Sequence, residues 1–264
     1  MENRIEDVQY CEKLFDSFYD VGCTETGGVT RLGYSAQEDQ MHEVFAGLAK
    51  ELNCKILKDE VGNTYASNAN GKEYYLIGSH LDSVIEGGRY DGVAGIIAGL
   101  MVMRWAREDG VNIPLRVGAF RCEESSNFGC CTIGSGLITK EIYKQDVGSL
   151  VSKAGKSLEQ IFRERSFEEA KKGDQICIQA IEEMTDTLGK GIANICYVLN
   201  PEIVVLGGGI MAQETFLKDR IKGAVKKYLV SSIEKHTKIT FAENQNDAGM
   251  LGAFYHFCGM HLKE

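Results

Sequence analysis

Residues 75–106 restrict the fold more than any other part of the sequence. A short apolar run, YLI at 75–77, leads into the polar and glycine-rich stretch GSHLDSVIEGGRYDG at 78–92. An apolar segment rich in Gly and Ala follows over 93–106. The apolar run before the glycine-rich stretch predicts a short strand, and the 93–106 segment is typical of a helix packed closely on a sheet. This strand, loop and helix therefore favour a layered α/β fold.

The rest of the chain shows the same alternation of helical and extended patterns. In the first part, apolar spacing predicts helices over 5–18 and 41–52 and strands over 54–58, 62–67 and 115–120. The pattern changes beyond about residue 165. There we expect a long helix that ends at Asn200-Pro201, a strand over 202–206, a helix over 213–234, a strand over 238–242 and a last helix opened by Asn246-Asp247.

Composition and charge argue against some classes of binding partner. The chain has 264 residues, 44% of them hydrophobic, and a net charge of -9. Nucleic acids and anionic membrane surfaces both attract clustered Lys and Arg, so we expect neither as a partner. No apolar run is long enough to cross a bilayer, and the acidic N-terminus lacks the features of a signal peptide. Nine cysteines without C-x-x-C spacing favour reduced thiols and a cytoplasmic protein.

Polar side chains with metal chemistry follow two of the predicted strands. His80 and Asp82 stand at the carboxyl end of the strand near 75–79, where open α/β sheets place their binding crevices. His80 could bind a metal through one ring nitrogen while Asp82 fixes the other. The glycine-rich turn could return the carboxylate of Asp91 toward His80, where its two oxygens could bridge two cations. Glu123 and Glu124 follow the later strand and could supply a general base and a further ligand.

Each of these features taken singly has a simpler interpretation. A lone histidine near a strand end is usually structural or exposed, and a Glu-Glu pair is usually a solvated face. The joint pattern is more informative: H-x-D after one strand, D-G after a glycine turn, and E-E after a later strand. We therefore interpret the five residues together as a candidate metal site.

Four segments resemble a known family of metalloenzymes. They are GGVTRLGYS (27–35), DEVGNTYA (59–66), GSHLDSVIEGGRYDGVAGIIAGL (78–100) and FRCEESSNFGCCTIGSG (120–136). These segments closely resemble zinc-dependent amidohydrolases, a family that includes N-carbamoyl-L-amino-acid hydrolase, allantoate amidohydrolase and β-ureidopropionase, within the aminoacylase and carboxypeptidase metallopeptidase clan. The resemblance covers about residues 5–160.

The resemblance implies a role for each candidate residue and two bound ions, Zn or Mn. His80 is similar to a ligand of one metal, Asp91 to the bridging ligand, and Glu124 to a ligand of the other metal. Asp82 resembles the residue that orients the histidine. Glu123 resembles the base that activates water for attack on a carbamoyl or amide carbon of a small-molecule substrate.

Later motifs of that family are not recognisable here. They are an H-x-E-Q-G motif with a further metal histidine, a lid and dimerisation domain, and a histidine near the C-terminus. Each metal would then have two protein ligands, whereas a catalytic zinc normally has three. His256 and His261 could by position imitate the C-terminal ligand, but an exposed tail is the simpler expectation.

Two segments of the second half resemble a different family. AKKGDQICIQAIEEMTDTLGKGIANICYVLNPEIVVLGGGI (170–210) and NDAGMLGAF (246–254) are similar to the C-terminal part of ROK-family sugar kinases and repressors, over about 168–258. The resemblance implies that Gly207, Gly208 and Gly209 lie near the adenosine of ATP. A tight structural turn is the alternative for an isolated triple glycine. The phosphate loop, catalytic aspartate and cysteine-rich zinc motif of those kinases are missing, and DVGCT at 20–24 does not replace them.

The economical interpretation is a chimera joined near 150–170. Residues 1–160 would be a truncated metallo-amidohydrolase domain, a layered sheet of the zinc-peptidase type. Residues 168–264 would be an actin-like, ribonuclease-H-like α/β fragment of a ROK-type kinase. Uncovered sheet edges and apolar faces favour a homo-oligomer or docking of the two fragments on each other. Three functions stay open: a metal-dependent hydrolase of linear amide C-N bonds such as those of N-carbamoyl amino acids, a remnant that binds nucleotide or sugar, and a non-catalytic fusion protein.

Overall fold

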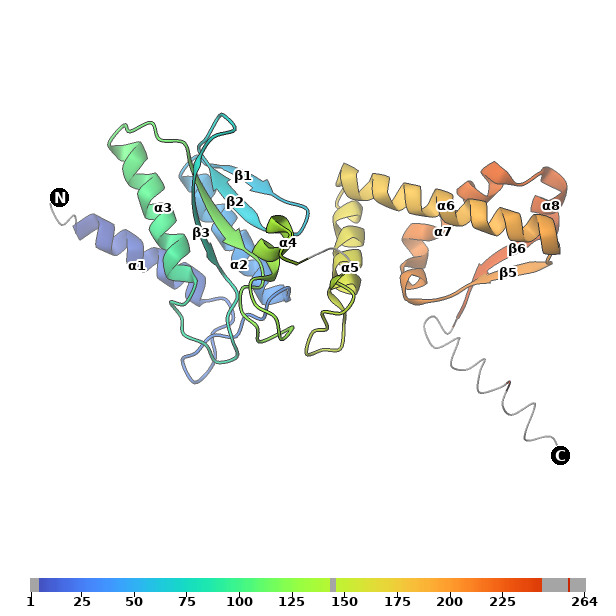
Figure 1. The fold of residues 1–264 in the computed structure, drawn as a ribbon, viewed down its shortest axis with the longest axis horizontal. Coiled ribbons are helices and arrows are strands. Elements are labelled where there is room, and N and C mark those ends of the chain that lie inside the picture. Colours follow the sequence, from blue (N-terminus) through green and yellow to red (C-terminus); the bar gives the residue numbers. More distant parts are fainter. Residues whose placement is uncertain (1–4, 143–145, 244–255, 257–264) are drawn as a thin grey trace. The chain divides into compact units, whose positions relative to one another are not determined.

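A computed structural model describes residues 5–142, 146–243 and 256 of the chain. The chain divides into two compact units, residues 1–163 and 164–264. Helices and strands alternate in both units (Figure 1), so the predicted mixed α/β class is confirmed. The helix predicted to open at Asn246-Asp247, and His261, lie outside the described residues.

The N-terminal unit is built on a four-stranded sheet. Its strands are β1 (Lys55–Lys58), β2 (Thr64–Ser67), β3 (Tyr75–His80) and β4 (Leu115–Phe120). They follow the order β1-β2-β4-β3, and only the β3 and β4 pair is parallel. The register of that pair runs from Tyr75 opposite Leu115 to His80 opposite Phe120. The carboxyl ends of β3 and β4 therefore lie side by side.

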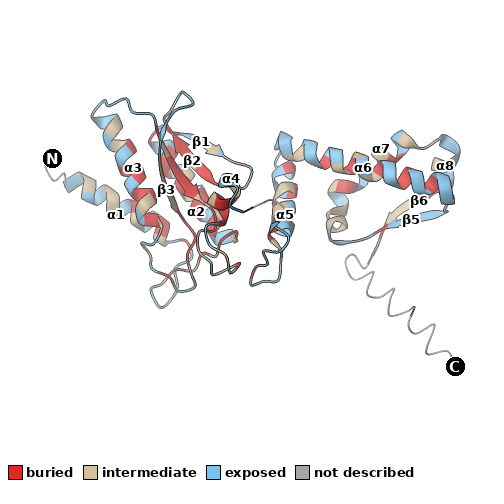
Figure 2. Cartoon of the chain, viewed as in Figure 1, coloured by how far each residue is buried: buried red, intermediate tan, exposed pale blue. Residues whose placement is uncertain are grey.

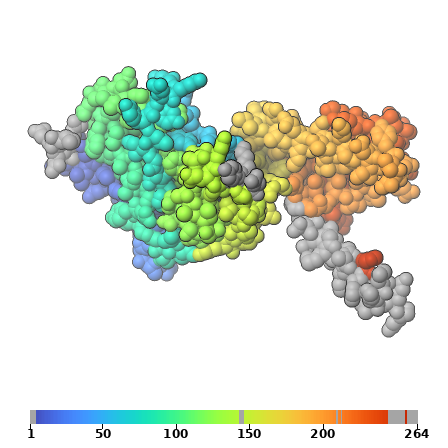
Figure 3. Space-filling view, in the orientation of Figure 1, coloured from blue at the N-terminus to red at the C-terminus, as the bar shows by residue number. Residues whose placement is uncertain are grey.

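Helices complete this unit and cover its sheet. They are α1 (Ile5–Tyr19), α2 (Ala36–Glu51), α3 (Val93–Glu108) and α4 (Ile133–Thr139), and α5 (Leu158–Lys171) continues into the second unit. The main apolar core is formed by buried residues of the sheet and of α1, α2 and α3. Buried residues are coloured red in Figure 2. On the surface of this unit, α1 and α3 adjoin although they lie far apart in the sequence (Figure 3, blue and green). Sequence patterns predicted α1, α2, α3 and the strands, but not α4 or α5.

The C-terminal unit pairs two parallel strands with long helices. Its elements are α6 (Gln175–Leu199), β5 (Ile203–Leu206), the 3-10 helix η2 (Gly209–Gln213), α7 (Glu214–Tyr228), α8 (Ser231–His236) and β6 (Lys238–Phe241). Helices α6 and α7 pack closely where Gly189 faces Ala224. Helix α6 ends at the predicted place, with Asn200 in a left-handed conformation before Pro201.

The single helix predicted over 213–234 is wrong, because the structure has a break between α7 and α8. Leu229 is extended there, and α8 begins after Val230. The Tyr197 hydroxyl from α6 donates to the carbonyl of Tyr228 (3.1 Å) and accepts from the Val230 amide (3.0 Å). This tertiary contact satisfies backbone groups at the break, and the apolar spacing of the segment does not reveal it.

Two further observations concern the cysteines and the apolar character of the helices. All eight cysteines within the described residues are free thiols. The described helices include none with the combination of length and apolar character that a membrane span requires.

Two helical glycines give a matched test of the packing of the N-terminal unit. A Cβ atom on Gly99 of α3 would lie 2.7 Å from Val117 Cγ2 in β4, whereas a Cβ on Gly47 of α2 would meet open space. We expect Gly99→Ala to lower the free energy of unfolding by about 1–3 kcal/mol through overpacking. Gly47→Ala should raise it by up to about 1 kcal/mol through helix propensity. Urea unfolding followed by circular dichroism measures both, and equal effects would contradict the close packing of α3 on β4.

Candidate metal centre

The candidate centre lies where the parallel strands β3 and β4 end. His80 is the last residue of β3 and lies opposite Phe120, the last residue of β4. Glu123 and Glu124 follow β4 after a two-residue turn, and Asp82 follows β3. Register alone therefore brings the histidine and the acidic pair to one edge of the sheet.

His80 is held through one ring nitrogen and offers the other to carboxylates. Its Nδ1 atom lies 3.1 Å from the backbone oxygen of Asp82 and 3.3 Å from Asp82 Oδ1. On the other side of the ring, Nε2 lies 3.7 Å from Glu123 Oε2 and 3.9 Å from Asp91 Oδ1. A ring fixed at Nδ1 presents Nε2 in the orientation that a metal ligand needs.

The fully buried carboxylate of Asp82 joins the two strand ends. Its Oδ1 accepts the backbone N-H of Glu123, and its Oδ2 accepts that of Glu124, each at 3.0 Å. Each oxygen accepts one of these donors, so Asp82 fixes the backbone of both glutamates. Sequence reasoning placed Asp82 beside His80 but missed its bonds to the backbone of the acidic pair.

Asp91 returns to His80 because of the glycine that follows it. Gly92 has a φ of +67°, and a Cβ atom there would lie 2.6 Å from His80 Cε1. Only glycine fits this close approach at a left-handed backbone position. Upstream in the same loop, the backbone of Gly87 exchanges two hydrogen bonds with Val29, which ties the loop to the GGVT segment.

His80, Asp91 and Glu124 together form a group that could hold a metal ion. One potential ligand atom from each residue lies within 4.8 Å of the other two, and the search of the described residues gives this one group. Burial raises the pKa of Glu124; His80 opposes this, while Asp91 and Glu123 add to it. An imidazole and two carboxylates are donors that suit Zn or Mn. The residues therefore fit one divalent cation with three protein ligands.

The second ion of the resembled family has no comparable set of ligands in the described part of the chain. His256 is described as an exposed helical residue and is not in the group. His42 is buried on α2, where its Nδ1 lies 2.9 Å from Thr64 Oγ1. The assignments of individual residues to ligand and base roles stay predictions.

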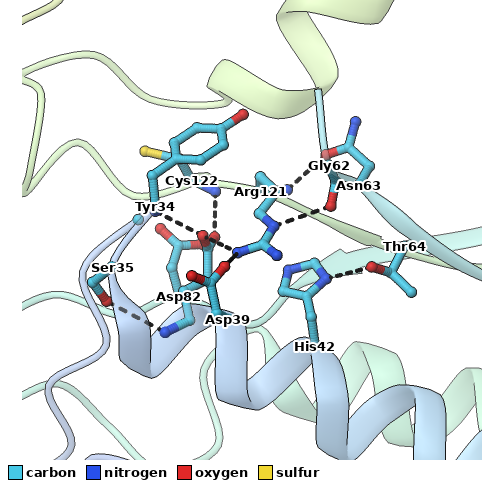
Figure 4. Close-up of polar contacts among 12 residues, drawn as sticks. Tyr34, Ser35, Asp39, His42, Gly62, Asn63, Thr64, Asp82, Arg121 and Cys122 are labelled. Carbon is cyan, nitrogen blue, oxygen red and sulfur yellow. Dashed lines mark hydrogen bonds and ion pairs between the residues drawn. The ribbon is translucent and has the colours of Figure 1, made fainter. Parts of the chain in front are cut away.

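A second buried network supports the turn between β4 and the acidic pair (Figure 4). Arg121 donates from Nη1 to Glu38 (2.9 Å) and Asp39 (2.6 Å), and from Nε to the carbonyl of Gly62 (3.0 Å). Its backbone N-H donates to Asn63 Oδ1 at 2.8 Å. The end of β4 is thus fixed to α2 and to the turn before β2.

The carbonyl groups of residues 121–123 are held by the start of α4. The amides of Gly134, Ile133 and Thr132 donate to the carbonyls of residues 121, 122 and 123 at 2.9, 2.9 and 2.7 Å respectively. Sequence reasoning missed Glu38, Arg121 and α4 as parts of the site. No spacing rule signals a buried ion pair between residues 83 positions apart.

The triple glycine of the second unit occupies a strand-to-helix turn. Gly207 and Gly208 are exposed after β5, Gly208 has a φ of +104°, and Gly209 begins η2. Both earlier interpretations, a nucleotide loop and a structural turn, agree with this placement. Nucleotide binding by these glycines stays a prediction.

Protonation of His80 should control metal affinity. Burial lowers its pKa, but the hydrogen bond and charge of Asp82, together with Glu123, outweigh burial and raise the pKa to about 9. A metal must displace this proton. We therefore expect the apparent Zn²⁺ affinity to rise about tenfold per pH unit between pH 6 and 8, with a plateau above about 9. Calorimetric titration in buffers of matched ionic strength checks this slope, and an affinity that does not change between pH 6 and 8 would contradict it.

Comparisons with known proteins find relatives of two kinds. An N-carbamoyl-L-amino acid amidohydrolase of Geobacillus stearothermophilus is 36% identical over 121 residues, 44% of this chain and 30% of that protein. The Thermotoga maritima glucokinase is 31% identical over 114 residues, 43% of this chain and 36% of that protein. A solved hydantoinase/carbamoylase family amidase from Burkholderia ambifaria superposes with a TM-score of 0.54 at 29% identity, covering 58% of this chain and 39% of that one.

These comparisons define a class for each region. The N-terminal region is homologous to N-carbamoyl-amino-acid and allantoate amidohydrolases. Residues 127–259, half of the chain, match the model of the ROK family. The chain therefore belongs to the ROK family, and it carries an amidohydrolase-like region in front. It spans about a third of the length of the curated relatives it matches.

Proposed function

We propose that the chain binds one divalent cation, Zn or Mn, through His80, Asp91 and Glu124 and hydrolyses linear amide C-N bonds. The convergence of these three donors within 4.8 Å is the observation that carries the proposal. Three protein ligands leave a coordination position open, as in catalytic rather than structural zinc sites. Homology of the N-terminal region to amidohydrolases points to small substrates of the N-carbamoyl amino acid or ureido type.

The residues around the site can share the work of hydrolysis. A bound cation supplies polarisation of the carbonyl oxygen of the substrate. Glu123, whose side chain is 39% exposed and whose Oε2 lies 3.7 Å from His80 Nε2, takes the proton from the attacking water. As the C-N bond breaks, the same carboxyl group returns that proton to the leaving nitrogen. Asp82 holds the backbone of Glu123 during both transfers.

Two substitutions separate metal binding from proton transfer. Glu123→Gln should keep one equivalent of metal per chain and lower the hydrolysis rate by about 10²–10⁴, because the amide cannot accept the proton. His80→Ala should lose both metal and activity, because the imidazole ligand is gone. Metal content by mass spectrometry and a hydrolysis panel of N-carbamoyl-L-amino acids and allantoate give the two readouts.

The same measurements distinguish the alternatives. Wild-type protein that contains no metal after purification and after soaking in Zn²⁺ or Mn²⁺ would end the hydrolase proposal. A folded protein without metal and without any ligand in the second unit would be a non-catalytic fusion. Full activity in Glu123→Gln would remove Glu123 from the role of base.

A second candidate function rests on the ROK family match over residues 127–259. We propose that the turn at Gly207–Gly209 contacts a nucleotide or sugar, because its exposed glycines permit close approach of a ligand to the backbone. Calorimetry with ATP and with an N-acylhexosamine should then show binding that Gly208→Val removes, since φ is +104° there. Gly191→Ala on α6, where a Cβ meets open space, is the matched control. The absence of heat with either ligand would exclude this function.

A further inference from the structure

We propose that Glu38 on α2 is a positioning residue that sets Glu123 and Glu124 in place through the backbone of Cys122. The inference rests on the proposed function for its catalytic meaning, because within the described residues the Glu38 carboxylate bonds to Tyr34, Arg121 and Cys122 and to none of the three candidate ligands. Its effect on the geometry of the acidic pair is a property of the metal-free protein and can be measured there.

The carboxylate of Glu38 gathers donors from three different residues. It is fully buried. Its Oε1 accepts the backbone N-H of Cys122 at 2.7 Å. Its Oε2 accepts the backbone N-H of Tyr34 at 2.7 Å and the Arg121 guanidinium at 2.9 Å. Glu38 thus anchors α2 to the residue that directly precedes the acidic pair.

Cys122 requires such an anchor because its backbone is in an uncommon conformation. Its φ is +51°, in the left-handed region that side-chain-bearing residues disfavour. Gly33 lies against its side chain, where a Cβ atom would come 2.3 Å from Cys122 Sγ. A residue held in this region persists only where the surroundings determine it, and such residues cluster at functional sites.

The conformation of Cys122 decides where the acidic pair lies. The next two backbone N-H groups, of Glu123 and Glu124, both point to the carboxylate of Asp82. If Cys122 relaxed to a common negative φ, the chain after it would turn away from Asp82, and both carboxylates would leave His80. The hydrogen bond between Glu38 and Cys122 therefore affects the positions of both glutamates beside His80.

Asp39 provides the comparison that separates positioning from simple ion pairing. It binds the same Arg121 Nη1 atom, at 2.6 Å, but its side chain is 41% exposed, and the backbone N-H of Cys122 donates to Glu38 instead. A buried ion pair by itself is weak evidence for stability. If Glu38 served only to neutralise Arg121, loss of either acid should affect the site in a similar way.

The test compares Glu38→Gln with Asp39→Asn in two measurements. In the metal-free protein, amide hydrogen exchange by NMR should show the Glu123 and Glu124 amides exchanging about tenfold faster or more in Glu38→Gln, although their acceptor is Asp82. Asp39→Asn should leave these two rates nearly unchanged. In calorimetry, Glu38→Gln should weaken Zn²⁺ binding roughly ten- to a hundredfold, the range for residues that orient metal ligands.

Two further variants keep the proposal open to refutation. If Glu38→Gln does not fold, Glu38→Asp replaces it, because the shorter acid keeps its charge but should not reach the Cys122 amide. Cys122→Gly in the Glu38→Gln protein should slow the exchange of the two amides again, because glycine adopts a positive φ freely. A substitution that removes a buried side chain would not rescue a purely structural defect.

The role of Glu38 and the proposed function can be refuted separately. Equal exchange rates at Glu123 and Glu124 in Glu38→Gln and in wild type would overturn the inference, and so would equal effects of Glu38→Gln and Asp39→Asn. Wild-type protein that binds no Zn²⁺ would instead refute the proposed function, while the exchange rates would still decide the role of Glu38.

Discussion

The candidate site depends on one buried carboxylate, which follows one strand and accepts hydrogen bonds from the backbone that follows the neighbouring strand. Asp82 follows β3, and its two oxygens receive the backbone N-H groups of Glu123 and Glu124, which follow β4. Parallel pairing brings the strand ends together, but the residues beyond them have no ladder to hold them. Beyond the strand ends, the hydrogen bonds to Asp82 take the place of backbone pairing. The Asp82 carboxylate also contacts His80. One side chain thus sets the relative positions of the histidine and both glutamates.

Around this contact, the site is built on loop backbone that is fixed from several directions. Glu38 and Arg121 bind the turn after β4 from α2, and the first amides of α4 bind its carbonyls. Polar groups buried in this way are costly unless each has its partner, and here they have them. The outcome is an acidic pair whose backbone is hydrogen-bonded on several sides, while the side chain of Glu123 stays 39% exposed. A pre-organised set of donors of this kind favours metal binding and proton transfer without rearrangement.

Most of the fold and the members of the site follow from local pattern, but the connections between them do not. Helical spacing and apolar runs predicted α1, α3 and the strands, since those elements bury one face or lie inside a sheet. The H-x-D, D-G and E-E motifs pointed to the five candidate site residues. The role of Glu38 depends on a contact across 84 positions with a backbone amide in a left-handed conformation, and no periodicity records either fact. The break after Tyr228 likewise depends on a hydroxyl from another helix.

The contacts of α4 also bear on where the two regions can be separated. The match to the ROK family begins at residue 127, whereas the first compact unit extends to residue 163. A fragment cut at the family boundary would end before α4 and lose the amides of residues 132–134 that hold the carbonyls of 121–123. A fragment cut after residue 163 would keep them. The two family matches therefore overlap: residues 132–134 lie inside the ROK match and also inside the 120–136 segment that resembles amidohydrolases, and their amides support the candidate site of the N-terminal unit.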